Sequence, residues 1–151
     1  MFRDILFAFL AITTALSAQT AVRHIQTQNS GIASAVWAGD TLYVSGQLAT
    51  PVSQGVWGDT KTQAASALSK IEALLKEQGL GMGDVVMMHV YLVGDPSNGG
   101  KMDFAGLNAA YGQFFGTKDQ PNKPARTTVQ VAALAQQGPL VEIEVIAVRP
   151  K

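Results

Sequence analysis

The segment from Asp84 to Val93, with the sequence DVVMMHVYLV, constrains the fold of this chain more than any other. Valine, methionine, tyrosine and leucine occupy both alternating sets of positions, so a strand here presents apolar side chains on both of its faces. Such a strand is typical of the interior of a sheet that is covered on both sides. The rest of the chain must supply neighbouring strands and a cover for each face.

Two apolar stripes with helical spacing supply part of that cover. The first is bounded by Asp59 or Thr60 as the N-cap and by Gly79 at its end. Its members step by four, three and four residues: Ala64, Leu68, Ile71 and Leu75. The second begins near Asp103 and ends at Gly116. Its members are Phe104, Leu107, Tyr111 and Phe114 or Phe115.

The remaining strands complete a two-layer domain. Residues 34–47 predict two short strands around a turn at Gly39-Asp40, and the runs 125–134 and 141–148 predict the last two. The order strand, strand, helix, strand, helix, strand, strand predicts an α+β fold with a mixed sheet and two helices on one face. The other sheet face stays open in a monomer. We therefore expect a homo-oligomer whose sheets face inward.

Length and composition exclude several classes. The chain has 151 residues, 47% of them hydrophobic, which suits one domain with a substantial core. Lys+Arg and Asp+Glu are both 11, so the formal net charge is zero and nothing favours nucleic acid as a partner. The absence of cysteine excludes disulfides, thiolate metal sites and cysteine nucleophiles.

The first 18 residues are typical of an export signal. Arg3 precedes an apolar run from Ile5 to Leu16, and small residues around Ala18 suit cleavage before Gln19. The predicted organisation is a signal peptide at 1–18, a connector at 19–30 and a single domain at 31–151. The mature protein is expected in the periplasm or secreted, without membrane attachment. If the segment is an uncleaved extension instead, the protein is cytosolic.

The histidines and Ser45 do not form a recognisable catalytic or metal site. Neither His24 nor His89 has a second ligand at metal-binding spacing, so each is interpreted as a core or interface histidine. Ser45 lacks the surroundings of a nucleophile elbow. No metal and no cofactor is expected.

Arg126 is the only charge in the strand-like segment PARTTVQV, residues 124–131. A guanidinium at the start of a strand can hold a carboxylate by two parallel hydrogen bonds. The alternative is a structural ion pair with Glu142 or Glu144, which share one face of the last strand. That strand is expected to pair with the arginine strand. Residue types alone leave both interpretations open.

Several segments together resemble the Rid family, the YjgF-type enamine/imine deaminases. LYVSGQLA, DVVMMHVYL, LNAAYGQFF, PARTTVQVAAL and VEIEVIAV occur in the family's order and spacing, over roughly residues 31–149. The resemblance implies a chorismate-mutase-like α+β fold, a homotrimer, three sites between subunits and no cofactor. It agrees with the open sheet face inferred above.

The resemblance also implies roles for individual residues. Arg126 matches the arginine that binds the substrate carboxylate, and Glu142 matches the acidic residue near the attacking water. Ser45 and Gly46 match the turn that lines the cleft. Asn108 matches a recurrent asparagine that fixes the loop or helix start. We expect the Arg126 guanidinium to face a cleft between subunits, near Glu142 of the same chain.

Two positions depart from the family pattern. The family usually has GPYSQA near its start, whereas this chain has GIASAV, so Ile32 stands where a tyrosine lines the cleft. The cleft should be more apolar. Thr128 stands where cysteine is common, which keeps the size and loses the thiol.

The function implied is hydrolysis of 2-imino acids or their enamine tautomers to 2-oxo acids and ammonia. One alternative is a non-catalytic trimer that binds a small carboxylate such as an oxo acid. A second, an endoribonuclease, is disfavoured by the zero net charge and by the lack of a histidine pair. A third is a chaperone-like or structural assembly.

Overall fold

The computed structural model describes residues 21–151. The predicted export signal at 1–18 lies outside the described residues. The strands are β1 (Val22–Ile25), β2 (Ala35–Ala38), β3 (Thr41–Leu48), β4 (Val85–Val93), β5 (Ala125–Val131) and β6 (Val141–Val148). The helices are α1 (Thr60–Glu77) and α2 (Phe104–Tyr111), with short 3₁₀ turns at Met82–Asp84 and Pro96–Asn98.

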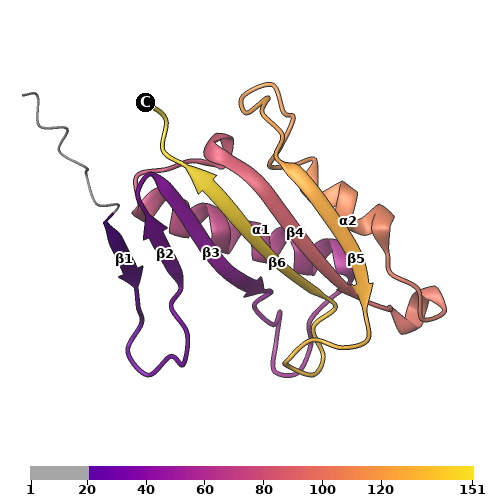
Figure 1. Cartoon of the computed structure of the whole chain (residues 1–151). Helices are drawn as coiled ribbons and strands as arrows, with labels where there is room; N and C mark the ends of the chain where they lie inside the picture. The colour runs from indigo at the N-terminus through magenta and orange to yellow at the C-terminus, as the bar shows by residue number, and fades with distance from the viewer. Residues whose placement is uncertain (1–20) are drawn as a thin grey trace, which may run out of the picture.

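The six strands form one mixed sheet in the order β1-β2-β3-β6-β4-β5. All neighbours are antiparallel except β4 and β5, which run parallel and are connected through α2. Both helices lie on the same face of the sheet (Figure 1). The predicted two-layer α+β fold, with two helices covering one face of a mixed sheet, is therefore confirmed.

Helix α1 follows the predicted stripe, because all four of its apolar members are fully buried. Asp59 is the N-cap, and its side chain accepts a hydrogen bond from the Thr62 N–H at 2.8 Å. Gly79 has φ +75°, a left-handed conformation that ends the helix at low cost. Truncating a fully buried residue such as Leu68 to alanine would cost about 2–5 kcal/mol of stability.

Helix α2 is shorter than its apolar stripe predicts. It begins after Asp103, whose carboxylate accepts from the Gly106 N–H, and it ends at Tyr111 rather than at Gly116. Residues 112–114 continue as a turn, and Phe115 packs into the core against the Tyr111 ring, with centroids 4.9 Å apart. The spacing of apolar residues in the sequence therefore continues beyond the end of the helix, because the turn that follows also packs an apolar side chain into the core.

Two strand assignments differ from the sequence prediction. β1 lies within the segment predicted as a connector, and it pairs with β2 so that His24 faces Val36. The expected pairing of the arginine strand with the glutamate strand is wrong. β5 pairs only with β4 among the described strands, and β6 lies between β3 and β4.

The two faces of the sheet differ in burial. On the helix-covered face, Met88, Val90 and Leu92 of β4 are fully buried, and Ile143 and Val145 of β6 are buried beside them. The opposite face, which we call the open face, leaves Tyr43 48% and Val129 41% exposed. Within residues 21–151, neither helix has the length and apolar character needed to cross a bilayer.

Candidate functional site

Arg126 lies at the start of β5 and is held by one side of helix α2. Its Nη2 group donates to Asn108 Oδ1 at 2.9 Å. Its guanidinium carbon lies 4.6 Å from the centre of the Tyr111 ring and 5.5 Å from that of Phe104. Residues 104, 108 and 111 are four and three apart, so they share one side of the helix. Cation–π contacts and one hydrogen bond therefore position the arginine.

The guanidinium has no acidic partner in the described part of the chain. No carboxylate among residues 21–151 lies within ion-pair distance of Arg126. Its Nη1 atom and the Thr128 Oγ1 atom, two residues along the same strand, are buried without a hydrogen-bond partner. The structural alternative, an ion pair with Glu142 or Glu144, is therefore wrong. A half-buried cation with unused donors is suited to an anionic ligand.

The charge of Arg126 also affects the pKa of the Tyr111 side chain that it contacts. Burial raises the pKa of the Tyr111 hydroxyl above its ordinary value of 10.0, and the positive charge of Arg126 opposes this rise. Burial is the larger effect, so Tyr111 is neutral at physiological pH. A neutral ring keeps the electron-rich face that attracts the guanidinium.

Glu142 lies on β6, where the bulge in β3 brings the backbone close to it. The register of β3 against β6 shifts between Val44 and Gln47. Ser45 and Gly46 are the two residues within this irregular stretch. A Cβ atom on Gly46 would overlap the Glu142 carboxylate, so only glycine allows this approach. The predicted cleft residues Ser45, Gly46 and Glu142 are thus brought together.

The loop before β2 is attached to the same bulge. The Ser45 hydroxyl donates to the Ala33 carbonyl at 2.7 Å. Ile32, the preceding residue, is 68% exposed, and its backbone is held by hydrogen bonds to the Ser30 hydroxyl. The position where the family has its tyrosine therefore presents an exposed aliphatic side chain.

Arg126 and Glu142 lie on opposite faces of the sheet. Arg126 is in register with Met88, on the helix-covered face. Glu142 is in register with Tyr91, three residues further along β4, and therefore on the open face. The expectation that the guanidinium lies near Glu142 of the same chain is wrong. Asn108 and Thr128 accompany the arginine, whereas Ser45 and Gly46 accompany the glutamate.

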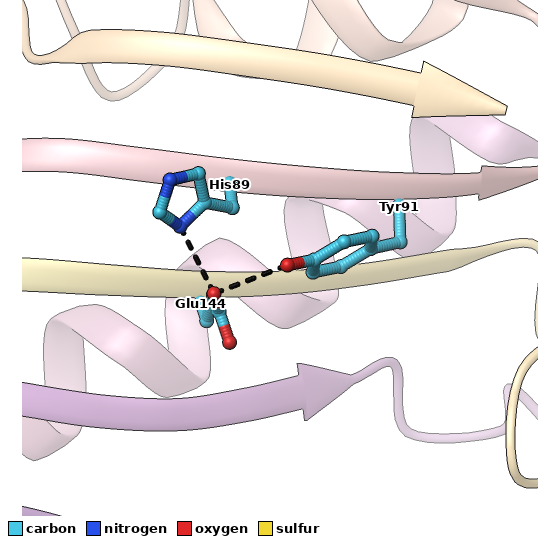
Figure 2. Close-up of polar contacts among 3 residues, drawn as sticks. All are labelled: His89, Tyr91 and Glu144. Atoms are coloured by element: carbon cyan, nitrogen blue, oxygen red, sulfur yellow. Dashed lines mark hydrogen bonds and ion pairs between the residues drawn. The ribbon is translucent and has the colours of Figure 1, made fainter. Parts of the chain in front are cut away.

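The sequence prediction missed a polar cluster on the open face (Figure 2). His89 Nδ1 is 2.9 Å from Glu144 Oε1, and the Tyr91 hydroxyl donates to the same oxygen at 3.2 Å. Burial raises the pKa of Tyr91 above 10.0, and Glu144 raises it further. The register of β4 against β6, which places His89 opposite Glu144, was the missing information.

Within residues 21–151, no cluster of three or more histidine, aspartate or glutamate side chains is arranged to hold a metal ion.

Comparisons with known proteins identify a family and several relatives. A model of the family described as Endoribonuclease L-PSP matches residues 25–149. A RutC family protein of Haemophilus influenzae is 39% identical over 116 residues, which cover 76% of this chain and 84% of the relative. TdcF of Escherichia coli, whose name describes a reactive intermediate deaminase, is 36% identical over 112 residues, covering 74% and 81%.

Solved structures of relatives show the same fold. The structure of Escherichia coli TdcF with bound serine has a TM-score of 0.67 and 32% identity, and the match covers 85% of this chain and 99% of that chain. The structure of RidA from an Antarctic Psychrobacter has a TM-score of 0.66 and 34% identity, covering 84% and 99%.

Proposed function

Because this chain belongs to the Endoribonuclease L-PSP family, which includes the YjgF and RidA proteins, we propose that it is a deaminase of reactive imines. Its substrates would be 2-imino acids and their enamine tautomers, and its products 2-oxo acids and ammonia. The observation that supports this most strongly is the half-buried Arg126 guanidinium, which has no carboxylate partner within residues 21–151.

Arg126 would bind the substrate carboxylate. One nitrogen is already oriented by Asn108 Oδ1, and the Tyr111 ring fixes the plane of the guanidinium. A charge-assisted hydrogen bond to such a group contributes about 1.5–3 kcal/mol. The relative TdcF has been solved with bound serine, which carries a carboxylate of the same kind.

Glu142 would orient the attacking water and accept its proton. The water oxygen forms a bond to the carbon of the protonated C=N group, giving a carbinolamine. The nitrogen then takes up the proton held by Glu142 and the C–N bond breaks, so that ammonia leaves. The hydroxyl group returns its proton to Glu142 as the C=O bond of the 2-oxo acid forms. The protonated imine is already electrophilic, so positioning of the two reactants, which contributes about 7–11 kcal/mol at best, is sufficient without a cofactor.

The two halves of the site would come from different protomers. Arg126 and Glu142 leave opposite faces of one sheet, so one chain by itself does not bring them together. A homotrimer with the open faces inward would place the Arg126 edge of one protomer beside the Ser45–Gly46–Glu142 group of its neighbour. The exposed Tyr43 and Val129 on the open face suit such a contact.

The experiment that tests the proposal is an imine-hydrolysis assay. An amino-acid oxidase generates 2-iminopropionate, and its loss is followed with and without the full-length protein. The wild type should accelerate the loss. Arg126→Ala should abolish the acceleration, and Arg126→Lys should be nearly as damaging because a point charge does not fix the imine plane.

Arg149 provides a matched control for that assay. It also stacks on an aromatic ring, at 4.5 Å from the centre of Trp37, but lies just beyond the end of β6. Arg149→Ala should leave the rate unchanged. Equal rates for the wild type and Arg126→Ala would overturn the catalytic proposal. Thermal stabilisation by 2-oxobutanoate without turnover would instead support a carboxylate-binding protein.

Export is a separate proposal, based on the signal-like residues 1–18. Expression in a Gram-negative host with fractionation should give a periplasmic protein whose first residue is Gln19. Recovery of the uncleaved chain in the cytosol would contradict it.

A further inference from the structure

Gln63 is a polar side chain of α1 that is fully buried. Its Nε2 group donates to the Gly58 carbonyl at 2.9 Å, and its Oε1 atom accepts from the Leu140 N–H at 2.7 Å. Burying an amide is unfavourable unless its donor and its acceptor are both paired, and here each is paired with the backbone of a different loop. The side chain therefore links the loop before α1 to the loop before β6.

These two loops lie at the end of the sheet that holds Glu142. The strands β3, β4 and β5 end there, and β6 begins there (Figure 1). Glu142 is the second residue of β6 and forms the last pair with β3, opposite Leu48. The loops also touch each other, since a Cβ atom on Gly138 would overlap the Trp57 indole. The Gln63 contacts are thus made where β6 enters the sheet.

The backbone of Leu140 is held on both sides at this point. Its N–H donates to Gln63, and its carbonyl accepts from the Val93 N–H, at the end of β4, at 2.9 Å. The ends of strands open more easily than their centres, and the pairing of β3 with β6 becomes irregular shortly after Glu142. Without the Gln63 amide, the start of β6 would lose its only contact with helix α1 through a side-chain hydrogen bond within the described residues.

We propose that Gln63 is a positioning residue, which anchors Leu140 and so fixes the backbone from which Glu142 orients the attacking water. This inference rests on the proposed function. A displacement of about 1 Å in a reacting group can slow a reaction about a hundredfold. Arg126 lies at the start of β5, away from this end of the sheet, so binding of the substrate carboxylate does not depend on Gln63.

The Gln63 contacts are also independent of the assembly. The amide and both of its hydrogen bonds lie within one protomer, and the side chain is already fully buried there. Covering the open face in a homotrimer therefore neither creates nor removes them.

Gln63→Met tests the proposal, because methionine has a similar length and makes neither hydrogen bond. In the imine-hydrolysis assay with the full-length protein, kcat should fall at least about tenfold, and KM should change by no more than about twofold. The control is Leu75→Ala, which opens a cavity at a fully buried position about 18 Å away along the same helix. Assayed below its melting temperature, this variant should keep the wild-type kcat.

Gln63→Glu adds a pH profile that a loss of stability does not produce. A protonated carboxyl group can accept from Leu140 and donate to Gly58 as the amide does, whereas a carboxylate only accepts. Burial favours the neutral form and raises the pKa of a carboxyl group introduced there. The ratio of its kcat to that of the wild type should therefore be highest in mild acid and fall severalfold as the pH rises, while KM stays constant.

Hydrogen exchange measures the anchoring without using the activity. In Gln63→Met the backbone amides of residues 140–142 should exchange at least about tenfold faster than in the wild type. The amides in the middle of β4 should keep their protection, because they lie within the sheet and do not contact Gln63.

Four results would overturn the proposal: an unchanged kcat or unchanged exchange in Gln63→Met, an equal loss of kcat in Leu75→Ala, or a constant ratio in Gln63→Glu. An inactive wild type would instead overturn the proposed function, and the role of Gln63 in catalysis with it. The exchange measurement separates these failures, because it shows in either case whether Gln63 anchors Leu140.

Discussion

At the scale of single residues, Asn108 controls whether the Arg126 charge is available. Its amide oxygen accepts one guanidinium hydrogen bond without neutralising the charge. Asn108→Asp keeps the shape and the contact but introduces a carboxylate that pairs with Arg126. We expect the KM for imino acids to rise about tenfold or more, with the folded state retained, because the internal carboxylate competes with that of the substrate.

The control for this prediction is Asn108→Ala, which removes the contact and leaves Arg126 charged. It should raise KM less than Asn108→Asp does. A steady-state comparison of KM and kcat, with thermal melts of both variants, separates the two effects. If Asn108→Asp binds substrate as the wild type does, Arg126 does not hold the substrate carboxylate.

Gly46 is a second residue that decides the geometry of the site, because it has no Cβ atom. Because a Cβ atom there overlaps the Glu142 carboxylate, Gly46→Ala must displace Glu142 or strain the bulge. Because only the flexible Glu142 side chain stands in the way, the expected cost in the free energy of unfolding is below about 1 kcal/mol, whereas imine hydrolysis should be lost as the carboxylate is displaced. Chemical denaturation measures the first quantity.

Two comparisons make the Gly46 prediction specific. Gly31→Ala, in the neighbouring loop, has open space around its Cβ and should be close to neutral. In the double variant Gly46→Ala/Glu142→Ala the clash is absent, so its destabilisation should be smaller than the sum of the two single effects. Additive values would mean that the two residues do not touch.

The residue types of the site could be predicted from the sequence, but the contacts could not. Arg126, Asn108 and Glu142 were all identified as candidates from their motifs. That Arg126 rests on Tyr111 depends on how α2 packs against β5, and the His89–Glu144 pair depends on strand register. Both are non-local features that side-chain periodicity within one segment does not contain.

At the scale of elements, helix α1 depends on the Asp59 cap. The hydrogen bonds to Thr62 lower the pKa of Asp59 below its ordinary value of 3.8. A carboxyl group whose pKa is lowered by folding stabilises the fold above that ordinary value, and this contribution is lost as the pH falls through the folded-state pKa. Asp59→Ala should therefore cost about 1 kcal/mol at neutral pH and less in acid.

Denaturation curves at pH 7 and near pH 3 test the cap. Asp59→Asn keeps the acceptor without the charge, so it should retain most of the stability and lose the pH dependence. If Asp59→Asn is as destabilised as Asp59→Ala at both pH values, the side-chain oxygen does not cap the helix.

The elements themselves were largely predictable where periodicity is strong. The stripe from Ala64 to Leu75 and the Asp59 cap specified helix α1, and the Asp103 cap specified the start of α2, because burial and capping act locally. The end of α2 was wrong, since its apolar spacing continues past Tyr111. β1 was missed because Val22, Arg23 and His24 are all exposed, which leaves no alternation to detect. The position of β5 was wrong because nothing local specifies which strand edge it joins.

At the scale of the whole molecule, the distribution of the site over two faces has a consequence for assembly. The open face was predicted from the small number of helices, and the exposed Tyr43 and Val129 agree with it. A protomer has Arg126 on its helix-covered side and Glu142 on its open side. If both act on one substrate, each protomer must complete the site of another.

Mixed assemblies test this directly. Arg126→Ala and Glu142→Gln should each be inactive alone, since every site in either assembly lacks one group. When the two proteins are unfolded, mixed in equal amounts and refolded together, random association places an intact Arg126 beside an intact Glu142 of the neighbour in about a quarter of the sites. Imine hydrolysis should therefore recover to about a quarter of the wild-type rate.

The double variant Arg126→Ala/Glu142→Gln, refolded with the wild type, distinguishes this arrangement from a site within one chain. With shared sites, about a quarter of the sites in that mixture are intact, whereas sites within one chain leave about half intact. Sites within one chain also give no recovery in the first mixture. For a site within one chain, the Arg126 side chain would have to pass around the edge of the sheet to reach Glu142. The two side chains leave the sheet from opposite faces, which disfavours this arrangement.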